Sequence, residues 1–176
     1  MIAFKQISKA ALVVAVIAIL PACWPFSKKV EAKVLPSLYI INVLDKSSYE
    51  DCRITGSTNV PFDQVESFAK GLDKNAEIVV YCANYMCTAS GASAQKLKEL
   101  GFEKVWAYEG GSAQWYQLSL KNPEKYKIEG VCAASYVRAP NEKPAESEPS
   151  HVPVIEADEL YEKMVTHGII IAEPSK

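Results

Sequence analysis

The sequence predicts an α/β fold in which a small parallel sheet is flanked by helices on both faces. Residues 78–81 and 105–108 are short apolar runs that indicate buried strands. A helical segment opens after each of them, near Ala89 and near Ser112. Strands that alternate with helices are typical of a parallel sheet with both faces covered. Sites in such sheets lie beyond the carboxyl ends of the strands, so the residues that follow position 81 are candidates for chemistry.

Glycine and proline residues mark the turns between these elements. Gly101 follows the first of the two helices, as a glycine that ends a helix should. The pair 110–111 is Gly-Gly and permits a sharp turn from the second strand into the second helix. Gly56 and Pro61 are turn residues that allow a loop to cross the top of the sheet.

Length and charge restrict the classes of function. A chain of 176 residues permits one domain of ordinary size with appendages. Its formal net charge is −2, and the sequence has no basic run with interleaved aromatic residues. We therefore expect no nucleic acid partner. Nothing in the composition calls for a cofactor.

Residues 1–22 are predicted to be a signal peptide of the bacterial lipoprotein type. Lys5 and Lys9 supply a positively charged start, and residues 10–20 form an uninterrupted apolar stretch. A membrane-spanning helix needs about 20 apolar residues, so this stretch has instead the length of the apolar part of a signal peptide.

Cys23 is the predicted site of lipid attachment. The segment Leu20-Pro21-Ala22-Cys23 resembles a bacterial lipobox, in which cleavage precedes the cysteine. Residues 23–36 would then be a tether, and the domain would be exported to the cell envelope as a membrane-anchored lipoprotein or a periplasmic protein. Ordinary signal cleavage and an uncleaved anchor are the alternatives.

Cys82 stands where the first buried strand ends and a helix is about to begin. A thiol at such a junction can face the main-chain N–H groups at the start of the helix, which stabilise a thiolate or a bound anion. The thiolate is the reactive form of cysteine, so this position favours a nucleophile. The alternative is a small buried apolar residue, because cysteine often fills cores.

Five segments, in order along the chain, resemble one known family. They are residues 38–43, 49–61, 78–82, 97–102 and 105–115, and they include Gly56, Pro61, Cys82, the Gly-Gly pair and Trp115. Together they make residues 38–118 resemble the rhodanese-like domain. We accordingly place the domain boundaries at residues 37 and 131.

The resemblance implies a sulfurtransferase that carries sulfane sulfur as a persulfide on Cys82. A small sulfur donor would load the cysteine, a thiol would accept the sulfur, and no cofactor would be required; no protein partner is indicated. The resemblance also implies that the loop holds the persulfide through main-chain N–H groups. That active-site loop consists of Ala83, Asn84, Tyr85, Met86, Cys87 and Thr88.

The missing cation of the loop and two residues, Arg53 and Cys87, raise further expectations. The loop contains no Lys or Arg, which places thiosulfate in doubt as the donor. Arg53 is a candidate anion contact in place of that missing charge; the alternative is a surface ion pair with Glu50 or Asp51, worth less than about 1 kcal/mol. Cys87 is a candidate resolving thiol that could form a disulfide with Cys82, or else a small residue turned into the core. We expect no metal site, since a closed zinc site needs four ligands.

The C-terminal part of the chain is predicted to contain a linker and a short folded segment. Residues 132–151 are a linker, because the stretch rich in Pro, Glu and Ser cannot bury enough surface to order itself. The segment 152–176 has a strand–helix–strand pattern, with strands at 152–155 and 169–172, a helix at 156–167 and Gly168 after it. It either docks on the domain or is the remnant of a second one.

Two other functions compete with sulfur transfer. A non-catalytic binding module at the membrane would use the fold without the chemistry. A cysteine-based phosphatase of the same fold would need an Arg six residues after the cysteine to clamp the phosphate, and Thr88 stands there. His151 and His167 are the chain's two histidines, both in the C-terminal part, and we expect them to be solvated rather than catalytic.

Overall fold

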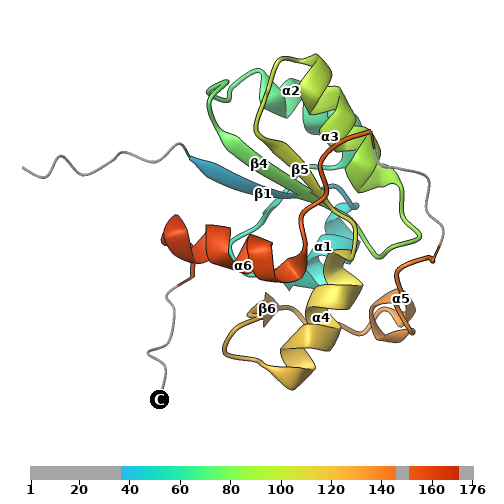
Figure 1. The fold of residues 1–176 in the computed structure, drawn as a ribbon. Coiled ribbons are helices and arrows are strands. Elements are labelled where there is room, and N and C mark those ends of the chain that lie inside the picture. The colour runs from blue at the N-terminus through green and yellow to red at the C-terminus, as the bar shows by residue number, and fades with distance from the viewer. Residues whose placement is uncertain (1–36, 146–150, 171–176) are drawn as a thin grey trace, which may run out of the picture. The chain divides into compact units, whose positions relative to one another are not determined.

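The computed structural model describes residues 37–145 and 151–170, and its main element is a parallel sheet of four strands. The strands are β1 (Leu38–Asn42), β3 (Thr58–Asn59), β4 (Glu77–Tyr81) and β5 (Val105–Tyr108). Their order in the sheet is β3-β1-β4-β5, so β4 lies between two neighbours (Figure 1). Both strands predicted at 78–81 and 105–108 are confirmed, and the α/β class is confirmed with them.

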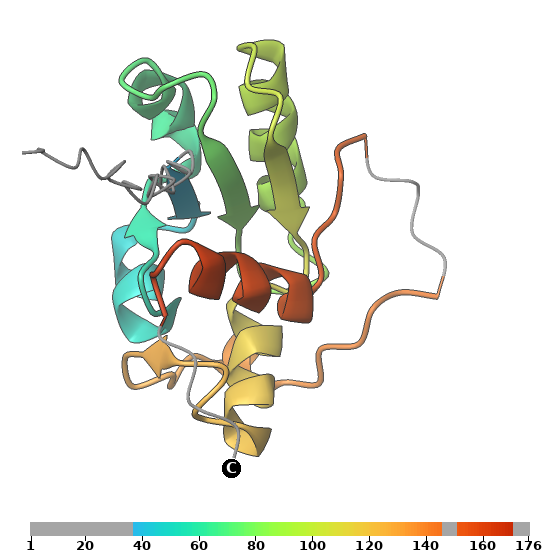
Figure 2. The same cartoon turned by 60° about the vertical axis from the view of Figure 1, so that its left-hand side comes forward.

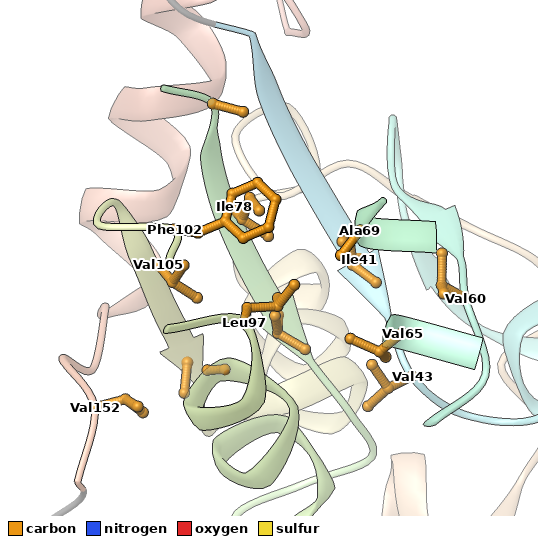
Figure 3. Packing of buried hydrophobic residues seen from close by; sticks show 14 of the residues in the cluster. Ile41, Val43, Val60, Val65, Ala69, Ile78, Leu97, Phe102, Val105 and Val152 are labelled. Carbon is orange, nitrogen blue, oxygen red and sulfur yellow. The ribbon is translucent and has the colours of Figure 1, made fainter. Parts of the chain in front are cut away.

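The two faces of the sheet carry two separate cores because alternate side chains of each strand point to opposite sides. From β4, Ile78 and Val80 point to one face and Val79 and Tyr81 to the other. The first face packs against α2 (Val65–Ala69) and α3 (Ala89–Glu99), and Figure 3 shows Leu97 and Val65 meeting the strands there. The second face is covered by α4 (Gly111–Lys121) and α6 (Ala157–Thr166) (Figure 2).

Smaller elements complete this part of the chain. The helices α1 (Lys46–Asp51) and η1 (Phe62–Gln64) belong to the connection between β1 and α2. A second sheet of two antiparallel strands pairs β2 (Arg53–Ile54) with β6 (Ile128–Glu129). A short helix, α5 (Ser135–Arg138), follows.

The beginning of the predicted linker is folded, which corrects the boundary drawn at residue 132. Cys132 and Val137 are buried in a small cluster with Cys52. The main-chain N–H groups of Ala133 and Ala134 each donate to the Asp51 carboxylate at 3.0 Å. Sequence composition missed this because two apolar residues among polar ones are enough to anchor a short helix when a neighbouring carboxylate binds its first amides. Residues 146–150 of the predicted linker lie outside the described residues.

The C-terminal segment lies against the sheet through a helix rather than through two strands. The strand expected at 152–155 is a single parallel bridge between Val154 and Ala107 of β5. Helix α6 buries Ala157, Leu160 and Met164 in the core of the second face. The strand expected at 169–172 is absent from its described part, residues 169–170, and residues 171–176 lie outside the described residues. The sequence therefore predicted a strand at each end of this segment. The structure has only a bridge to the sheet edge at Val154, and residues 169–170 form no strand.

No helix within residues 37–145 and 151–170 is long and apolar enough to cross a membrane. The predicted signal peptide, Cys23 and the tether all lie outside these ranges, so they remain predictions.

Candidate active site

Cys82 follows the last residue of β4, on the face of the sheet that packs against α3. Its side chain is 0% exposed and belongs to the apolar core of that face. Its S–H lies 3.1 Å from the main-chain carbonyl oxygen of Cys87 and 3.4 Å from the Ser90 hydroxyl in the first turn of α3. Cys82 is therefore held at the base of the loop, as its position in the sequence predicts.

The loop that follows Cys82 is closed by hydrogen bonds within it and by one to Asn141. The N–H of Cys87 donates to the carbonyl oxygen of Asn84 at 3.0 Å, and the N–H of Met86 donates to the Asn84 side chain at 3.1 Å. The N–H of Tyr85 donates to the side chain of Asn141 at 3.1 Å. Three of the six loop amides thus have protein acceptors, so fewer of them face a bound sulfur than the resemblance implied.

The pKa values of the Cys82 and Cys87 thiols move apart. The interaction with Cys87, followed by burial, raises the pKa of Cys82 well above the usual range of a thiol. The interaction with Cys82, with the main-chain N–H groups of Ala83 and Ala89, lowers the pKa of Cys87 to about 5. The sequence led us to expect the thiolate at Cys82. Cys82 is instead buried with its S–H donated to the Cys87 carbonyl oxygen, which favours a neutral Cys82 and a thiolate at Cys87.

A cavity of about 470 Å³ opens beside the loop. Its lining residues come from the loop, from α3, from the end of β5 and from the C-terminal segment, and they are Tyr85, Cys87, Thr88, Ser90, Gly91, Ala92, Gln95, Glu109, Pro144, His151 and Val152. Cys87 is among them and Cys82 is not. The lining contains no Lys or Arg, and Glu109 contributes a carboxylate.

The start of α4 fixes the chain at Cys82 from the other side. The N–H groups of Ser112 and Ala113 donate to the carbonyl oxygens of Cys82 and Ala83 at 3.0 and 2.9 Å. Gly111 makes this approach feasible, because its φ is +61° and a Cβ there would lie 2.6 Å from the Cys82 carbonyl oxygen. The Gly-Gly pair predicted as a turn is thus also a contact surface for the loop.

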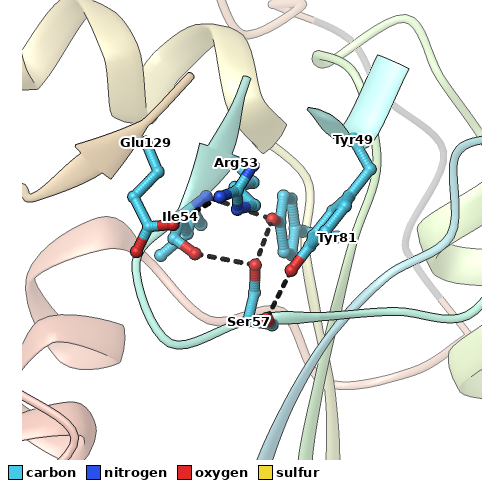
Figure 4. Close-up of polar contacts among 6 residues, drawn as sticks. All are labelled: Tyr49, Arg53, Ile54, Ser57, Tyr81 and Glu129. Carbon is cyan, nitrogen blue, oxygen red and sulfur yellow. Dashed lines mark hydrogen bonds and ion pairs between the residues drawn. The ribbon is translucent and has the colours of Figure 1, made fainter. Parts of the chain in front are cut away.

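A buried hydroxyl network supports the last residue of β4 (Figure 4). The Tyr81 hydroxyl accepts from the Ile54 N–H at 3.1 Å and lies 2.8 Å from the Ser57 hydroxyl, which donates to the Ile54 carbonyl at 2.7 Å. The Tyr49 hydroxyl donates to the Ser57 carbonyl at 2.6 Å. These bonds tie the loop after β2 to β4 next to Cys82.

Arg53 is engaged elsewhere and does not line the cavity. Its guanidinium forms an ion pair with Glu129 at 2.6 Å and lies 5.2 Å from the centre of the Tyr49 ring. The role of anion contact is therefore not supported by its position. The alternative partners that the sequence suggested, Glu50 and Asp51, are wrong as well. Glu129 lies 76 residues away in the sequence, and β6 brings it next to Arg53. No local sequence pattern predicted this strand.

The sequence reasoning missed the cavity residues that come from distant parts of the chain. His151 is exposed, as expected, but it also lies at the cavity with Cys87. Glu109 follows β5, at the same carboxyl edge as Cys82. Glu109 could have been found from the rule that sites lie at that edge. His151 could not, because only the docking of the C-terminal segment brings it there. Among the described residues, no group of three or more His, Cys, Asp or Glu side chains could hold a metal ion.

Curated relatives and solved structures resemble part of this chain. Two proteins named thiosulfate sulfurtransferase GlpE match it. The one from Tolumonas auensis is 30% identical over 81 residues, which is 46% of this chain and 74% of the relative. The one from Shewanella oneidensis is 30% identical over 83 residues, 47% of this chain and 80% of the relative.

Among solved structures, the rhodanese-like domain of the Alr3790 protein from Anabaena sp. is 28% identical, with a TM-score of 0.45 over 53% of this chain and 93% of that one. A rhodanese with anions from E. coli is 29% identical, with a TM-score of 0.39 over 44% of this chain and 91% of that one. The family model of the rhodanese-like domain matches residues 26–118, which is more than half of the sequence. The chain therefore belongs to the rhodanese-like domain family.

Proposed function

We propose that the protein is a sulfurtransferase that carries sulfane sulfur as a persulfide on Cys82. The observation that supports this most directly is the place of Cys82, at the base of a closed loop between β4 and α3 with its sulfur beside Ser90 and Cys87. The names of its relatives point the same way. Helix N-termini and main-chain amides stabilise anionic sulfur, which is what a bound persulfide presents.

The proposal is tested by mass spectrometry of the purified protein after incubation with sulfur donors. The wild type should gain one sulfur in the peptides of the loop, and Cys82→Ser should end with none on position 82 and should not turn over. Cys52→Ser is the matched control, since Cys52 is also 0% exposed but lies outside the loop, and it should still be loaded. Turnover by Cys82→Ser at the wild-type rate would contradict the assignment.

The cavity supports a donor other than thiosulfate. A dianionic donor would meet the Glu109 carboxylate and would find no Lys or Arg in the lining. Like charges in a partly enclosed cavity repel. The nearby Lys143 is already paired with Glu156 at 2.8 Å. We therefore propose an uncharged or zwitterionic persulfide as the donor and a small thiol as the acceptor.

The two competing functions give different results in the same assays. A non-catalytic binding module would gain no sulfur from any donor. A phosphatase would hydrolyse p-nitrophenyl phosphate, but Thr88 stands where the phosphate-clamping Arg is needed and no Arg lines the cavity. We expect sulfur loading and no phosphatase activity.

We also propose that the domain is held at the bacterial cell envelope by a lipid on Cys23. The support is the sequence pattern of residues 1–23 alone. Cys23→Ser should move the protein from the membrane fraction to the soluble fraction or stop its maturation. Unchanged fractionation, with an unchanged N-terminal mass, would favour an uncleaved anchor. Cys132→Ser, outside the signal segment, should fractionate as the wild type does.

A further inference from the structure

We propose that Cys87 takes the sulfane sulfur from a donor in the cavity and hands it to Cys82. This relay rests on the proposed function, in which Cys82 is the final carrier. It makes Cys87 a catalytic residue in its own right rather than a guard against oxidation. It also gives the cavity beside the loop a role as the donor site.

Access is the first argument. Cys82 is 0% exposed and is absent from the cavity lining, so a donor in the cavity cannot reach its sulfur without a movement of the loop. Cys87 is partly exposed and lines the cavity. The hydrogen bond from Cys87 to Asn84 and that from Tyr85 to Asn141 hold the loop closed over Cys82. The thiol that a donor meets first is therefore Cys87.

The contacts between the two thiols are the second argument. The S–H of Cys82 points at the Cys87 residue, 3.1 Å from its carbonyl oxygen. The main-chain N–H groups of Ala83 and Ala89 lower the pKa of Cys87, so an anionic sulfur is stabilised there. Cys82 keeps its proton in this arrangement. Nucleophile and proton donor are thus already assigned to different cysteines before the donor arrives.

The two transfer steps balance without an external oxidant or reductant. In the first, the Cys87 thiolate attacks the outer sulfur of a persulfide R–S–SH, the S–S bond of the donor breaks, and the thiolate R–S⁻ leaves with Cys87–S–SH formed. In the second, the Cys82 sulfur attacks the outer sulfur of Cys87–S–SH. The S–S bond on Cys87 breaks, and the proton from Cys82 goes to the Cys87 sulfur as it leaves. Each step exchanges one S–S bond for another.

The cavity lining points to the class of donor. Tyr85, Val152 and Pro144 offer apolar surface, while Glu109 and His151 offer polar groups of which the carboxylate disfavours an anion. A small organic persulfide with an ammonium group would satisfy both kinds of contact. Cysteine persulfide carries such an ammonium group beside its own carboxylate and is the probe we would use, with the dianion thiosulfate as the comparison.

The test follows the position of the added sulfur over time in the full chain. Cleavage after Tyr85 separates the Cys82 peptide from the Cys87 peptide, so each can be weighed by mass spectrometry. With cysteine persulfide, Cys82→Ser should load one sulfur on Cys87 at about the wild-type initial rate and keep it there. Cys87→Ser should load Cys82 at least tenfold more slowly. Cys87→Ala repeats the test with a second substitution. The melting temperatures of all variants show whether slow loading comes from a folding defect.

The outcomes separate the relay from the proposed function. If Cys87→Ser loads Cys82 at the wild-type rate, the relay is overturned and the sulfurtransferase stands. If Cys82→Ser takes no sulfur on Cys87, the relay is overturned in the same way. If the wild type takes no sulfur on either cysteine from either donor, the proposed function itself fails.

The geometry independently assigns a structural disulfide to Cys52 and Cys132, which lie 80 positions apart in the sequence. Both side chains are buried, at 0% and 3% exposure, in one small cluster with Val137. Burial raises the pKa of both thiols, and each thiol also shifts the pKa of the other. Cys132 has a φ of +51°, a left-handed conformation that residues with side chains rarely adopt.

The chain around this pair is arranged to keep the two cysteines together. The Cys132 N–H donates to the carbonyl oxygen of Asp51 at 2.7 Å, and the Asp51 carboxylate binds the next two amides. The pair of strands β2 and β6 ends beside them. Oxidation would remove a proton and an electron from each thiol and reduce a disulfide oxidant, such as glutathione disulfide, to two thiols.

The disulfide is tested by refolding the full chain in a glutathione redox buffer and mapping its peptides without reduction. A peptide in which Cys52 is joined to Cys132 should appear, and the oxidised protein should melt several degrees above the reduced one. Cys132→Ser should lose that difference in melting temperature while Cys87→Ser keeps it. If Cys52 and Cys132 can both still be alkylated after unfolding the treated wild type, the assignment is overturned.

Discussion

Ile155 donates its main-chain N–H to the carbonyl oxygen of Ala107 at 3.0 Å, and so attaches the C-terminal segment to the edge strand β5. The N–H of Ala107 in turn donates to the carbonyl oxygen of Pro153 at 2.9 Å. These two bonds occupy main-chain groups that an uncovered sheet edge would leave unpaired. From these two bonds the chain runs in one direction into α6 and in the other to His151 at the cavity. The same contact therefore holds α6 against the sheet and positions a residue of the cavity lining.

Leu160→Ala should destabilise the protein strongly. Leu160 is 0% exposed in the core that α6 completes, and removing a buried leucine side chain costs about 2–5 kcal/mol. A loss of that size lowers the melting temperature of a domain of this length by roughly 10 °C. Leu120→Ala is the matched control, because Leu120 is 68% exposed on α4, and it should change the melting temperature little. Equal melting of the two variants would mean that α6 is not part of the core.

Gly111→Ala should impair sulfur loading by displacing the loop. A Cβ at residue 111 would lie 2.6 Å from the main-chain carbons and oxygens of residues 82–83, which cannot move without breaking their bonds to α4. We expect loading of Cys82 to fall at least tenfold. Gly101→Ala is the control: its φ of +89° brings a strain of about 1 kcal/mol, but no heavy atom lies within 4 Å of the added carbon. That variant should lose stability and keep its rate of loading.

Glu109→Gln should make thiosulfate a better donor. Removing the carboxylate from the cavity lining relieves a repulsion that we place at about 1 kcal/mol for a screened dianion, which corresponds to roughly fivefold in kcat/KM. Glu103→Gln, at the opposite end of β5 and outside the cavity, should leave kcat/KM unchanged. A thiosulfate rate that does not respond to Glu109→Gln, measured alongside cysteine persulfide, would show that this carboxylate does not select the donor.

The layout of the fold was predictable because the strands of the first core are continuous apolar runs and the turns carry glycines that their backbone requires. The place of Cys82 was predictable for the same reason, since it directly follows the apolar run of β4. Which thiol holds the charge was not, because it depends on the amides of Ala83 and Ala89 and on the burial of Cys82. These are contacts across the loop, and a spacing of five residues does not determine them.

Contacts between residues that are far apart in the sequence could not be predicted for a different reason. Glu129 reaches Arg53 through β6, Cys132 reaches Cys52 through the main-chain carbonyl oxygen of Asp51, and His151 reaches the cavity through the bridge at Val154. Each pairing depends on where a segment with a weak preference for any secondary structure docks. The proposed resolving role of Cys87 also stays a prediction, which peptide mapping of a Cys82–Cys87 disulfide after mild oxidation would test.

Alkylation of Cys87 should become fast at a pH far below that of an ordinary thiol. The interaction with Cys82 and the amides of Ala83 and Ala89 lower the pKa of Cys87 to about 5, and only the thiolate reacts. The rate with iodoacetamide should therefore rise as the pH increases through about 5 and level off above it. Cys82→Ala removes the first of these interactions, so the rate for this variant should rise at a higher pH. The buried Cys82 should stay unmodified in the folded wild type throughout. A midpoint near 9 for Cys87 in both proteins would contradict the assignment of the charge, and with it the order of the two steps in the relay.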